Sequence, residues 1–245
     1  MSETYIGDEL ELFSQAKNWK NYWGSKVKPY LGKRVLEVGA GLGGTTQYLY
    51  NANIDTIEKW TCLEPDATLA KIIEEKINDK TIPACDVITS TLDTLKNQNN
   101  FYKILYDSIL YIDVIEHIEN DAAELTHTLS YLKTGGHLII LVPAHQYLYS
   151  PFDKSIGHYR RYSRSMLEKI IPEGYDIVQS HYLDALGLGT SLANKWFLKQ
   201  DYPTLPQILF WDKYVVTTST FVDKLLMHNV GKSVLLIARK KYEVF

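Results

Sequence analysis

The sequence has few cysteines, no long hydrophobic run and no strong excess of charge of one sign. Its two cysteines, Cys62 and Cys85, cannot build a disulfide framework, and nothing beside them has metal-ligand spacing. No charged-then-apolar leader opens the chain, and no apolar run approaches the ~18 residues that span a bilayer. A net charge of −3 gives no general affinity for nucleic acid or anionic lipid. We therefore expect a cytoplasmic protein without stable membrane insertion, without a nucleic-acid partner and without a metal.

What the chain does have is an ordinary globular share of hydrophobic residues, 45%, and 18 tyrosines. No internal repeat, low-complexity tract or Pro/Gly linker divides its 245 residues, so residues 1–245 are predicted to form a single domain. The tyrosines are amphipathic and suit a protein that encloses an organic ligand, although they suit the rim of a hydrophobic core equally well.

Hydrophobic patterning predicts an alternation of strands and helices. Short apolar runs predict buried strands, and helical spacing lies between them, with Asp121 and Glu124 resembling a capping box and Gly135-Gly136 ending that helix. This order predicts a Rossmann-like, doubly wound α/β sheet. Two later strands are separated by an aromatic, partly helical insertion that is too long for a plain connection. The expected strands are residues 34–38, 60–63, 81–87, 108–112, 137–142, 175–182 and 233–239.

A glycine-rich segment follows the first strand. Gly39 permits a tight turn, Ala40 lies beside it, and Gly41 lets the backbone approach a ligand closely. Glu64, at the end of the second strand, can accept hydrogen bonds from both hydroxyls of a ribose. The segment therefore predicts a nucleoside-containing cofactor.

The glycines alone also satisfy the spacing of a nicotinamide dinucleotide site. Glu37, two residues before the first glycine, argues against that alternative, because a nicotinamide-binding strand normally carries an apolar residue there. A carboxylate at this position suits a ligand with a positive amino group, and S-adenosylmethionine has one beside its sulfonium.

These segments together resemble the class I S-adenosylmethionine-dependent methyltransferases. The resemblance covers roughly residues 33–144 and implies a seven-stranded sheet whose last strand is antiparallel. The matching segments, in family order, are Val35-Leu36-Glu37-Val38-Gly39-Ala40-Gly41-Leu42-Gly43, Leu63-Glu64-Pro65-Asp66, Tyr106-Asp107-Ser108-Ile109, Asp113-Val114-Ile115-Glu116-His117-Ile118 and Leu132-Lys133-Thr134-Gly135-Gly136-His137-Leu138.

The resemblance implies roles for individual residues. Glu37 would orient the methionine amino group, and Glu64 would hold the ribose. Asp113, at the end of the fourth strand, would face the methionine end. The remaining residues implied to line S-adenosylmethionine are Gly39, Ala40, Gly41, Pro65, Val114 and, beside the adenine, Thr91 and Leu92.

The acceptor side is expected beyond the carboxyl ends of the strands, where ligands bind in doubly wound sheets. We predict a helical lid at 1–31, a cofactor-binding core at 32–144, an acceptor-side loop and insertion at 145–230, and the last strand at 231–245. Segment 185–228 could cover the acceptor or form a homodimer surface. The candidate general bases are His117, His145 and His158, and the candidate acceptor-binding residues are Tyr147, Tyr159, Arg160 and Arg161.

The arginines have two interpretations. They could bind an anionic group of the acceptor, or they could pair with Asp153 or Glu168 on the surface. The leading hypothesis for function is methyl transfer to an oxygen or nitrogen of a small organic acceptor, which could be anionic. A nicotinamide-dependent oxidoreductase and a non-catalytic adenosylmethionine-binding scaffold are the alternatives.

Overall fold

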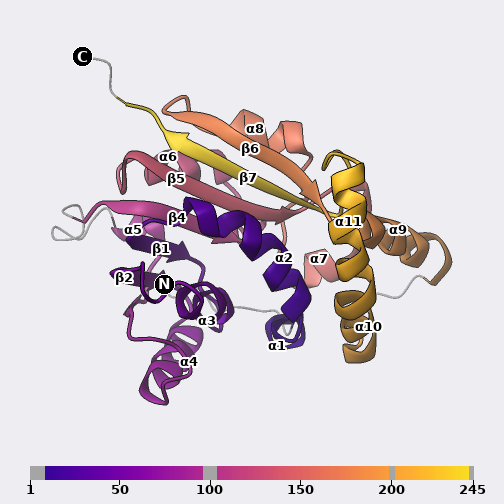
Figure 1. The fold of residues 1–245 in the computed structure, drawn as a ribbon, viewed down its shortest axis with the longest axis horizontal. Helices are drawn as coiled ribbons and strands as arrows, with labels where there is room; N and C mark the ends of the chain where they lie inside the picture. The colour runs from indigo at the N-terminus through magenta and orange to yellow at the C-terminus, as the bar shows by residue number, and fades with distance from the viewer. Residues whose placement is uncertain (1–8, 96–103, 199–201, 243–245) are drawn as a thin grey trace.

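A seven-stranded sheet organises the molecule in the computed structural model, which describes residues 9–95, 104–198 and 202–242 (Figure 1). The strand order is β3-β2-β1-β4-β5-β7-β6. Strands β1 to β5 pair in parallel, and β7 is antiparallel to both β5 and β6, which confirms the expected topology. The strands are β1 (Arg34–Val38), β2 (Lys59–Leu63), β3 (Asp86–Ile88), β4 (Tyr106–Ile112), β5 (Leu132–Pro143), β6 (Tyr175–Leu183) and β7 (Ser233–Lys240).

Helices cover both faces of the sheet. Val35 and Leu36 are both fully buried, but they join two different hydrophobic clusters because successive side chains of a strand point to opposite faces. The helices are α1 (Glu9–Ser14), α2 (Lys17–Val27), α3 (Gly44–Asn51), α4 (Ala67–Asn78), α5 (Leu92–Leu95), α6 (Asp121–Thr128), α7 (Pro151–Ser155), α8 (Arg164–Ile170), α9 (Ala185–Ala193), α10 (Leu205–Phe210) and α11 (Thr217–Leu225). Short 3-10 or π segments are η1 (Lys28–Tyr30), η3 (Ile115–His117), η4 (Gln146–Leu148), η5 (Asn194–Leu198) and η6 (Trp211–Val216).

The order of the strands also places the site. Strand β1 lies between β2 and β4, so the chain passes from one side of β1 to the other between β3 and β4. In such sheets ligands bind at this reversal, beyond the carboxyl ends of the strands. The relevant ends are Val38 of β1, Leu63 of β2 and Ile112 of β4.

The structure corrects the expected helix end and strand start around residue 130. The N-cap of α6 is Asn120, not Asp121, and the helix ends at Thr128. Gly135 and Gly136 lie inside β5, because Tyr106 pairs with Leu132 while Ser108 pairs with His137. The extra β5 residues form an irregularity, and Gly135 has a φ of 78° there. The glycines therefore accommodate a bulge and do not stop the helix.

The third strand is also shifted from its expected place at 81–87. It comprises only Asp86–Ile88, while Ile82 is 1% exposed and packs into the core. Pro83 follows Ile82, and it has no backbone N–H for a strand ladder.

The N-terminal helices and the insertion pack together as one unit. Asp212, which is 5% exposed, accepts hydrogen bonds from the backbone N–H groups of Asn18 (3.0 Å) and Trp19 (2.8 Å) at the start of α2. Asp223 joins them from α11, since it accepts a 2.6 Å hydrogen bond from the Tyr22 hydroxyl. Figure 1 shows α9, α10 and α11 at the end of the sheet where β7 begins, beside α2. That end is also the carboxyl end of β5, since Pro143 pairs with Ser233.

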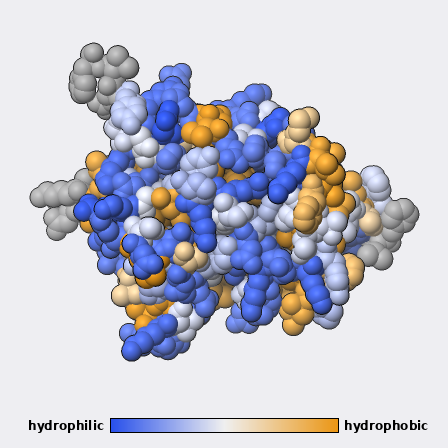
Figure 2. Space-filling view, in the orientation of Figure 1, coloured by the Kyte–Doolittle hydropathy of each residue, from blue (hydrophilic) through white to orange (hydrophobic). Residues whose placement is uncertain are grey.

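The outer surface of the insertion is apolar. Figure 2 shows hydrophobic residues gathered at the end of the molecule that α11 occupies. Phe210, Tyr214, Phe221, Leu225 and Met227 are all more than half exposed. None of the described helices is long and apolar enough to cross a membrane.

Candidate functional site

The glycine loop after β1 packs directly against the segment that leaves β4. Gly39, Gly41 and Gly43 have positive φ angles of 66°, 56° and 72°. A Cβ on Gly39 would lie 2.7 Å from a methyl carbon of Val114, so only glycine fits there. A Cβ on Gly41 would lie 3.6 Å from a methyl carbon of Leu10, which places α1 over the loop.

Glu64 lies beside this loop, at the end of β2. It is 4% exposed, and its two carboxylate oxygens accept hydrogen bonds from the backbone N–H groups of Gly41 (2.7 Å) and Asp66 (2.9 Å). Burial raises the pKa of Glu64 above its ordinary value, and these hydrogen bonds oppose that rise. Each oxygen keeps a second lone pair, which can accept a hydroxyl hydrogen.

Glu37 is the penultimate residue of β1 and is almost completely buried. One of its carboxylate oxygens accepts hydrogen bonds from the Thr46 hydroxyl (2.5 Å) and from the indole N–H of Trp60 (2.9 Å). Burial raises the pKa of Glu37 to about 7 in spite of these two donors. Its role toward a methionine amino group stays a prediction.

Asp113 follows β4 with a φ of 55°, and its backbone N–H donates to the carbonyl of Leu141 (2.8 Å). Asp113 is exposed, but desolvation by the protein packed around its carboxylate raises its pKa to about 6, and the charges of His158 and Lys232 partly oppose this rise. Glu37, Glu64 and Asp113 thus place three carboxylates with raised pKa values after neighbouring strands.

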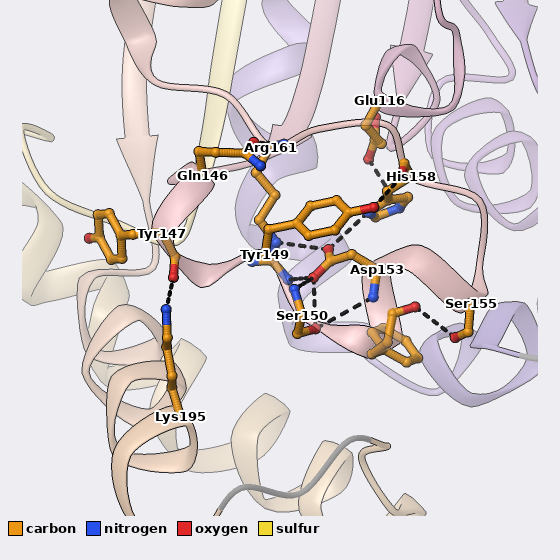
Figure 3. Close-up of polar contacts among 11 residues, drawn as sticks. Glu116, Gln146, Tyr147, Tyr149, Ser150, Asp153, Ser155, His158, Arg161 and Lys195 are labelled. Atoms are coloured by element: carbon orange, nitrogen blue, oxygen red, sulfur yellow. Dashed lines mark hydrogen bonds and ion pairs between the residues drawn. The ribbon is translucent and has the colours of Figure 1, made fainter.

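A second polar cluster lies just beyond β4 and β5 (Figure 3). Asp153 is fully buried, and it accepts hydrogen bonds from the Arg161 guanidinium (2.8 and 3.0 Å) and the Ser150 hydroxyl (2.8 Å). It also lies 2.9 Å from Nδ1 of His158. These donors hold the pKa of Asp153 well below its usual range against the effect of burial. Nε2 of His158 lies 3.9 Å from a carboxylate oxygen of Glu116.

The loop that carries Asp153 and His158 is fastened to the segment after β4. The Tyr159 backbone N–H donates to the carbonyl of Glu116 (2.8 Å). Arg160 donates to the Asp121 carboxylate (2.6 Å) and to the carbonyls of Ile118 and Glu119. Loop 145–162 is therefore held at the same edge of the sheet as Asp113.

With this geometry established, comparison with known proteins decides the family. The sequence model of a family described as a methyltransferase domain matches residues 10–184. The chain belongs to this methyltransferase family. This membership supports S-adenosylmethionine-dependent methylation, and the oxidoreductase alternative gains no support.

The individual relatives are distant. This chain is 26% identical, over 149 residues, to a hybrid PKS-NRPS synthetase (thnA) of Trichoderma harzianum. The match covers 58% of this chain but only 4% of that much longer protein.

Two solved structures share the fold. A structure of coclaurine N-methyltransferase bound to N-methylheliamine and SAH has a TM-score of 0.61 and 14% identity, covering 98% of this chain and 77% of that one. A structure of a putative methyltransferase from Bacillus halodurans has a TM-score of 0.59 and 17% identity, covering 93% of this chain and all of that one.

The residues around the glycine loop fit S-adenosylmethionine. Glu64 keeps acceptor capacity for ribose hydroxyls, and Gly39 and Gly41 adopt left-handed backbone conformations and present no side chain of their own. Pro65 continues from Glu64, and Ala40 is buried in the loop. Leu92 differs from the others, since its side chain is fully buried in the core. Thr91 directly precedes Leu92, the first residue of α5, and is partly exposed.

The three candidate histidines of the methyltransferase occupy different surroundings. His117 lies edge-on to His158, with ring centroids 4.5 Å apart, and burial lowers its pKa to about 4. His145 lies instead between Tyr147 and Tyr182, with stacked rings, and one of its ring nitrogens is 2.9 Å from the carbonyl oxygen of Gly231. The structure thus brings His117 and His158 together and keeps His145 apart in a stack.

The candidate acceptor-binding residues also divide into two groups. The side chains of Arg160 and Arg161 are 24% and 16% exposed. Arg161 pairs with Asp153, as one alternative predicted, although Asp153 is buried and not on the surface; the partner of Arg160 is Asp121, which was not predicted. Tyr147 and Tyr159 are each 51% exposed and stay available for an acceptor.

Two residues of this region were not predicted as site residues. Glu116 belongs to one of the motifs that carry the resemblance, and a glutamate beside a histidine after a strand is a signal that could have identified it. Lys232, whose Nζ lies 3.8 Å from the Trp211 ring centroid and 3.8 Å from Asp184, had no local signal.

Proposed function

We propose that this methyltransferase transfers a methyl group to an oxygen or nitrogen of a small organic acceptor that binds beside loop 145–162 and the insertion at 185–228. The observation that carries the proposal is the contact between these two segments at the carboxyl end of the sheet. Lys195 donates to the carbonyl of Tyr147 (Figure 3). The rings of Phe152 and Tyr202 lie 5.2 Å apart. Both segments therefore border the edge that carries Asp113.

The cofactor half of the proposed site is formed by the first strands. Glu64 would hold the ribose, Gly39 and Gly41 would line the cofactor, and Glu37 and Asp113 would act toward the methionine amino group. S-adenosylmethionine, when bound, supplies a methyl group that its sulfonium already activates. The chain's own task is then chiefly to bind and align the acceptor.

The acceptor half offers exposed aromatic side chains. The exposed rings of Tyr147 and Tyr159 can contact an organic acceptor. Because Arg160 and Arg161 already have carboxylate partners, the proposal does not require an anionic acceptor. When no cation occupies Nε2, His158 is a candidate proton acceptor, since its Nδ1 contacts Asp153 and its Nε2 lies 3.9 Å from Glu116, beyond hydrogen-bond distance.

A transfer assay tests the proposal. The purified chain is incubated with S-adenosylmethionine labelled in its methyl group and with separate pools of alcohols, phenols, carboxylic acids, sugars and amines. We expect S-adenosylhomocysteine and a labelled small molecule from at least one pool. Binding of S-adenosylhomocysteine without transfer to any pool would support the non-catalytic scaffold instead, and label confined to added RNA or protein would contradict a small acceptor.

The homodimer through 185–228 stays a prediction. Its motivation is the exposed apolar face of α10, η6 and α11. The molar mass in solution, measured by light scattering at micromolar concentration, checks it, with Phe221→Ser and Leu225→Ser as variants expected to give monomers.

A further inference from the structure

Glu116 presents an unusual buried carboxylate. It is 0% exposed, and neither of its side-chain oxygens has a hydrogen-bond partner. Among the residues that the structure describes, it is the one carboxylate for which both oxygens are buried and unpartnered. A buried charge without a partner is costly, so such a group is normally paired, protonated or bound to a metal.

Two imidazole rings face this carboxylate. Ligand atoms of Glu116, His117 and His158 all lie within 4.8 Å of one another. The shortest printed approach, from Nε2 of His158 to Oε1 of Glu116, is 3.9 Å, which is too long for a hydrogen bond. Ligands of a tetrahedral zinc ion at ~2.0–2.1 Å lie about 3.3 Å apart, so a small inward movement of side chains would complete the geometry.

Both rings are already oriented by other groups. Asp153 lies 2.9 Å from Nδ1 of His158 and is itself fixed by Arg161 and Ser150. His117 has a hydrogen bond with the backbone of Ile156. Histidines that bind a metal usually donate their second ring N–H to a carboxylate or a carbonyl in this way.

We infer that Glu116, His117 and His158 form a binding site for one divalent transition-metal cation of the zinc type. Two imidazoles and one carboxylate suit Zn²⁺, Co²⁺ or Fe²⁺ better than Ca²⁺ or Mg²⁺, which prefer oxygen ligands. Three protein ligands leave a coordination position open, as in catalytic zinc sites. This site replaces the sequence-based expectation that the chain holds no metal.

The position of the site gives it a role, which rests on the proposed function. Glu116 and His117 lie three and four residues after Asp113, at the edge of the sheet where the acceptor is proposed to bind. A cation there would bind an acceptor oxygen and favour its deprotonated form. The site therefore narrows the acceptor class to alcohols, phenols or other oxygen acceptors.

Metal titration of the full chain tests the inference without cofactor or acceptor. Chelator-treated protein is titrated with Co²⁺, followed by visible absorption, and with Zn²⁺, followed by calorimetry. We expect one equivalent to bind, with a visible spectrum of low-coordinate Co²⁺. Glu116→Gln and His117→Ala should each weaken binding by at least about tenfold, and Asp153→Asn by about 10- to 100-fold.

Matched controls separate this site from general metal binding. His181→Ala removes another half-buried histidine, which stacks on His228, and Glu168→Gln removes a carboxylate on α8. Both should bind the metals like the unmodified chain. Absence of stoichiometric binding, or equal binding by Glu116→Gln and His117→Ala, would overturn the inference. Because neither S-adenosylmethionine nor acceptor is present, failure here is distinct from failure of the transfer assay.

Discussion

At the scale of single residues, burial raises the pKa values of two glutamates near the carboxyl ends of central strands. Glu37 and Glu64 are 2% and 4% exposed, and the pKa of each is raised by burial although each accepts two hydrogen bonds. A carboxylate in such a position is a ready partner for a positive or hydroxyl-bearing ligand, because the ligand supplies the stabilisation that water no longer gives.

Glu37 should make the stability of the free protein fall as pH rises. Its pKa is raised from 4.5 to about 7, so in this window the folded state holds a proton that the unfolded state releases. Stability is therefore lost as pH increases through the window. We expect Glu37→Gln to gain about 2 kcal/mol relative to the unmodified chain between about pH 5 and pH 7.

Urea unfolding at several pH values measures this difference. Glu74→Gln, an exposed position on α4, is the control and should show a constant difference across the same range. A Glu37→Gln difference that is equally constant would show that Glu37 does not titrate in this window.

At the scale of elements, the N-terminal helix α2 depends on the insertion. Ala16, its N-cap residue, makes no side-chain hydrogen bond, and two backbone N–H groups of the first turn, those of Asn18 and Trp19, instead donate to Asp212. Asp212 stands 194 and 193 positions away in sequence from these two groups. Asp212 thus couples α2 to the insertion, beside the second link that Asp223 makes with Tyr22.

Removing this carboxylate should destabilise the fold. Asp212→Ala leaves two buried backbone donors of α2 without a charged acceptor, and we expect a loss of about 2–4 kcal/mol in the free energy of unfolding. Lys213→Ala, whose side chain is exposed on the same segment, should change it by less than about 0.5 kcal/mol. Equal stabilities for the two variants would show that α2 is held by packing alone.

Some elements can be predicted from the sequence and others cannot, for a physical reason. The strands at 34–38 and 60–63 were close to the observed β1 and β2, because a buried strand leaves a local run of apolar residues. The start of β5 was wrong, since the pairing irregularity opposite Tyr106 and Ser108 depends on a partner strand. The trans cap by Asp212 could not be predicted, because no local pattern links residues so far apart.

At the scale of the whole molecule, the proposed site has a cofactor half and an acceptor half, whose residues come from different parts of the chain. The cofactor half comes from successive strand-to-helix turns, at Gly39, Gly41 and Glu64, so its motif is visible in the sequence. In the acceptor half, Glu116 after β4 lies near His158 of the loop after β5, and that loop in turn contacts the insertion. The pairing of Arg161 with Asp153 was one of two alternatives offered from the sequence, whereas the contact of His117 with His158 appears only once the chain is folded.

Calorimetric titration with S-adenosylhomocysteine is the most direct test of the central claim that the cofactor binds at the ends of β1, β2 and β4. The unmodified chain and Glu74→Ala should bind it equally. Glu64→Ala removes two charge-assisted hydrogen bonds to the ribose, worth ~1.5–3 kcal/mol each before compensation by water, so affinity should fall by about tenfold to several hundred-fold. Equal affinity for the unmodified chain and Glu64→Ala, or binding of NAD without binding of S-adenosylhomocysteine, would contradict the claim.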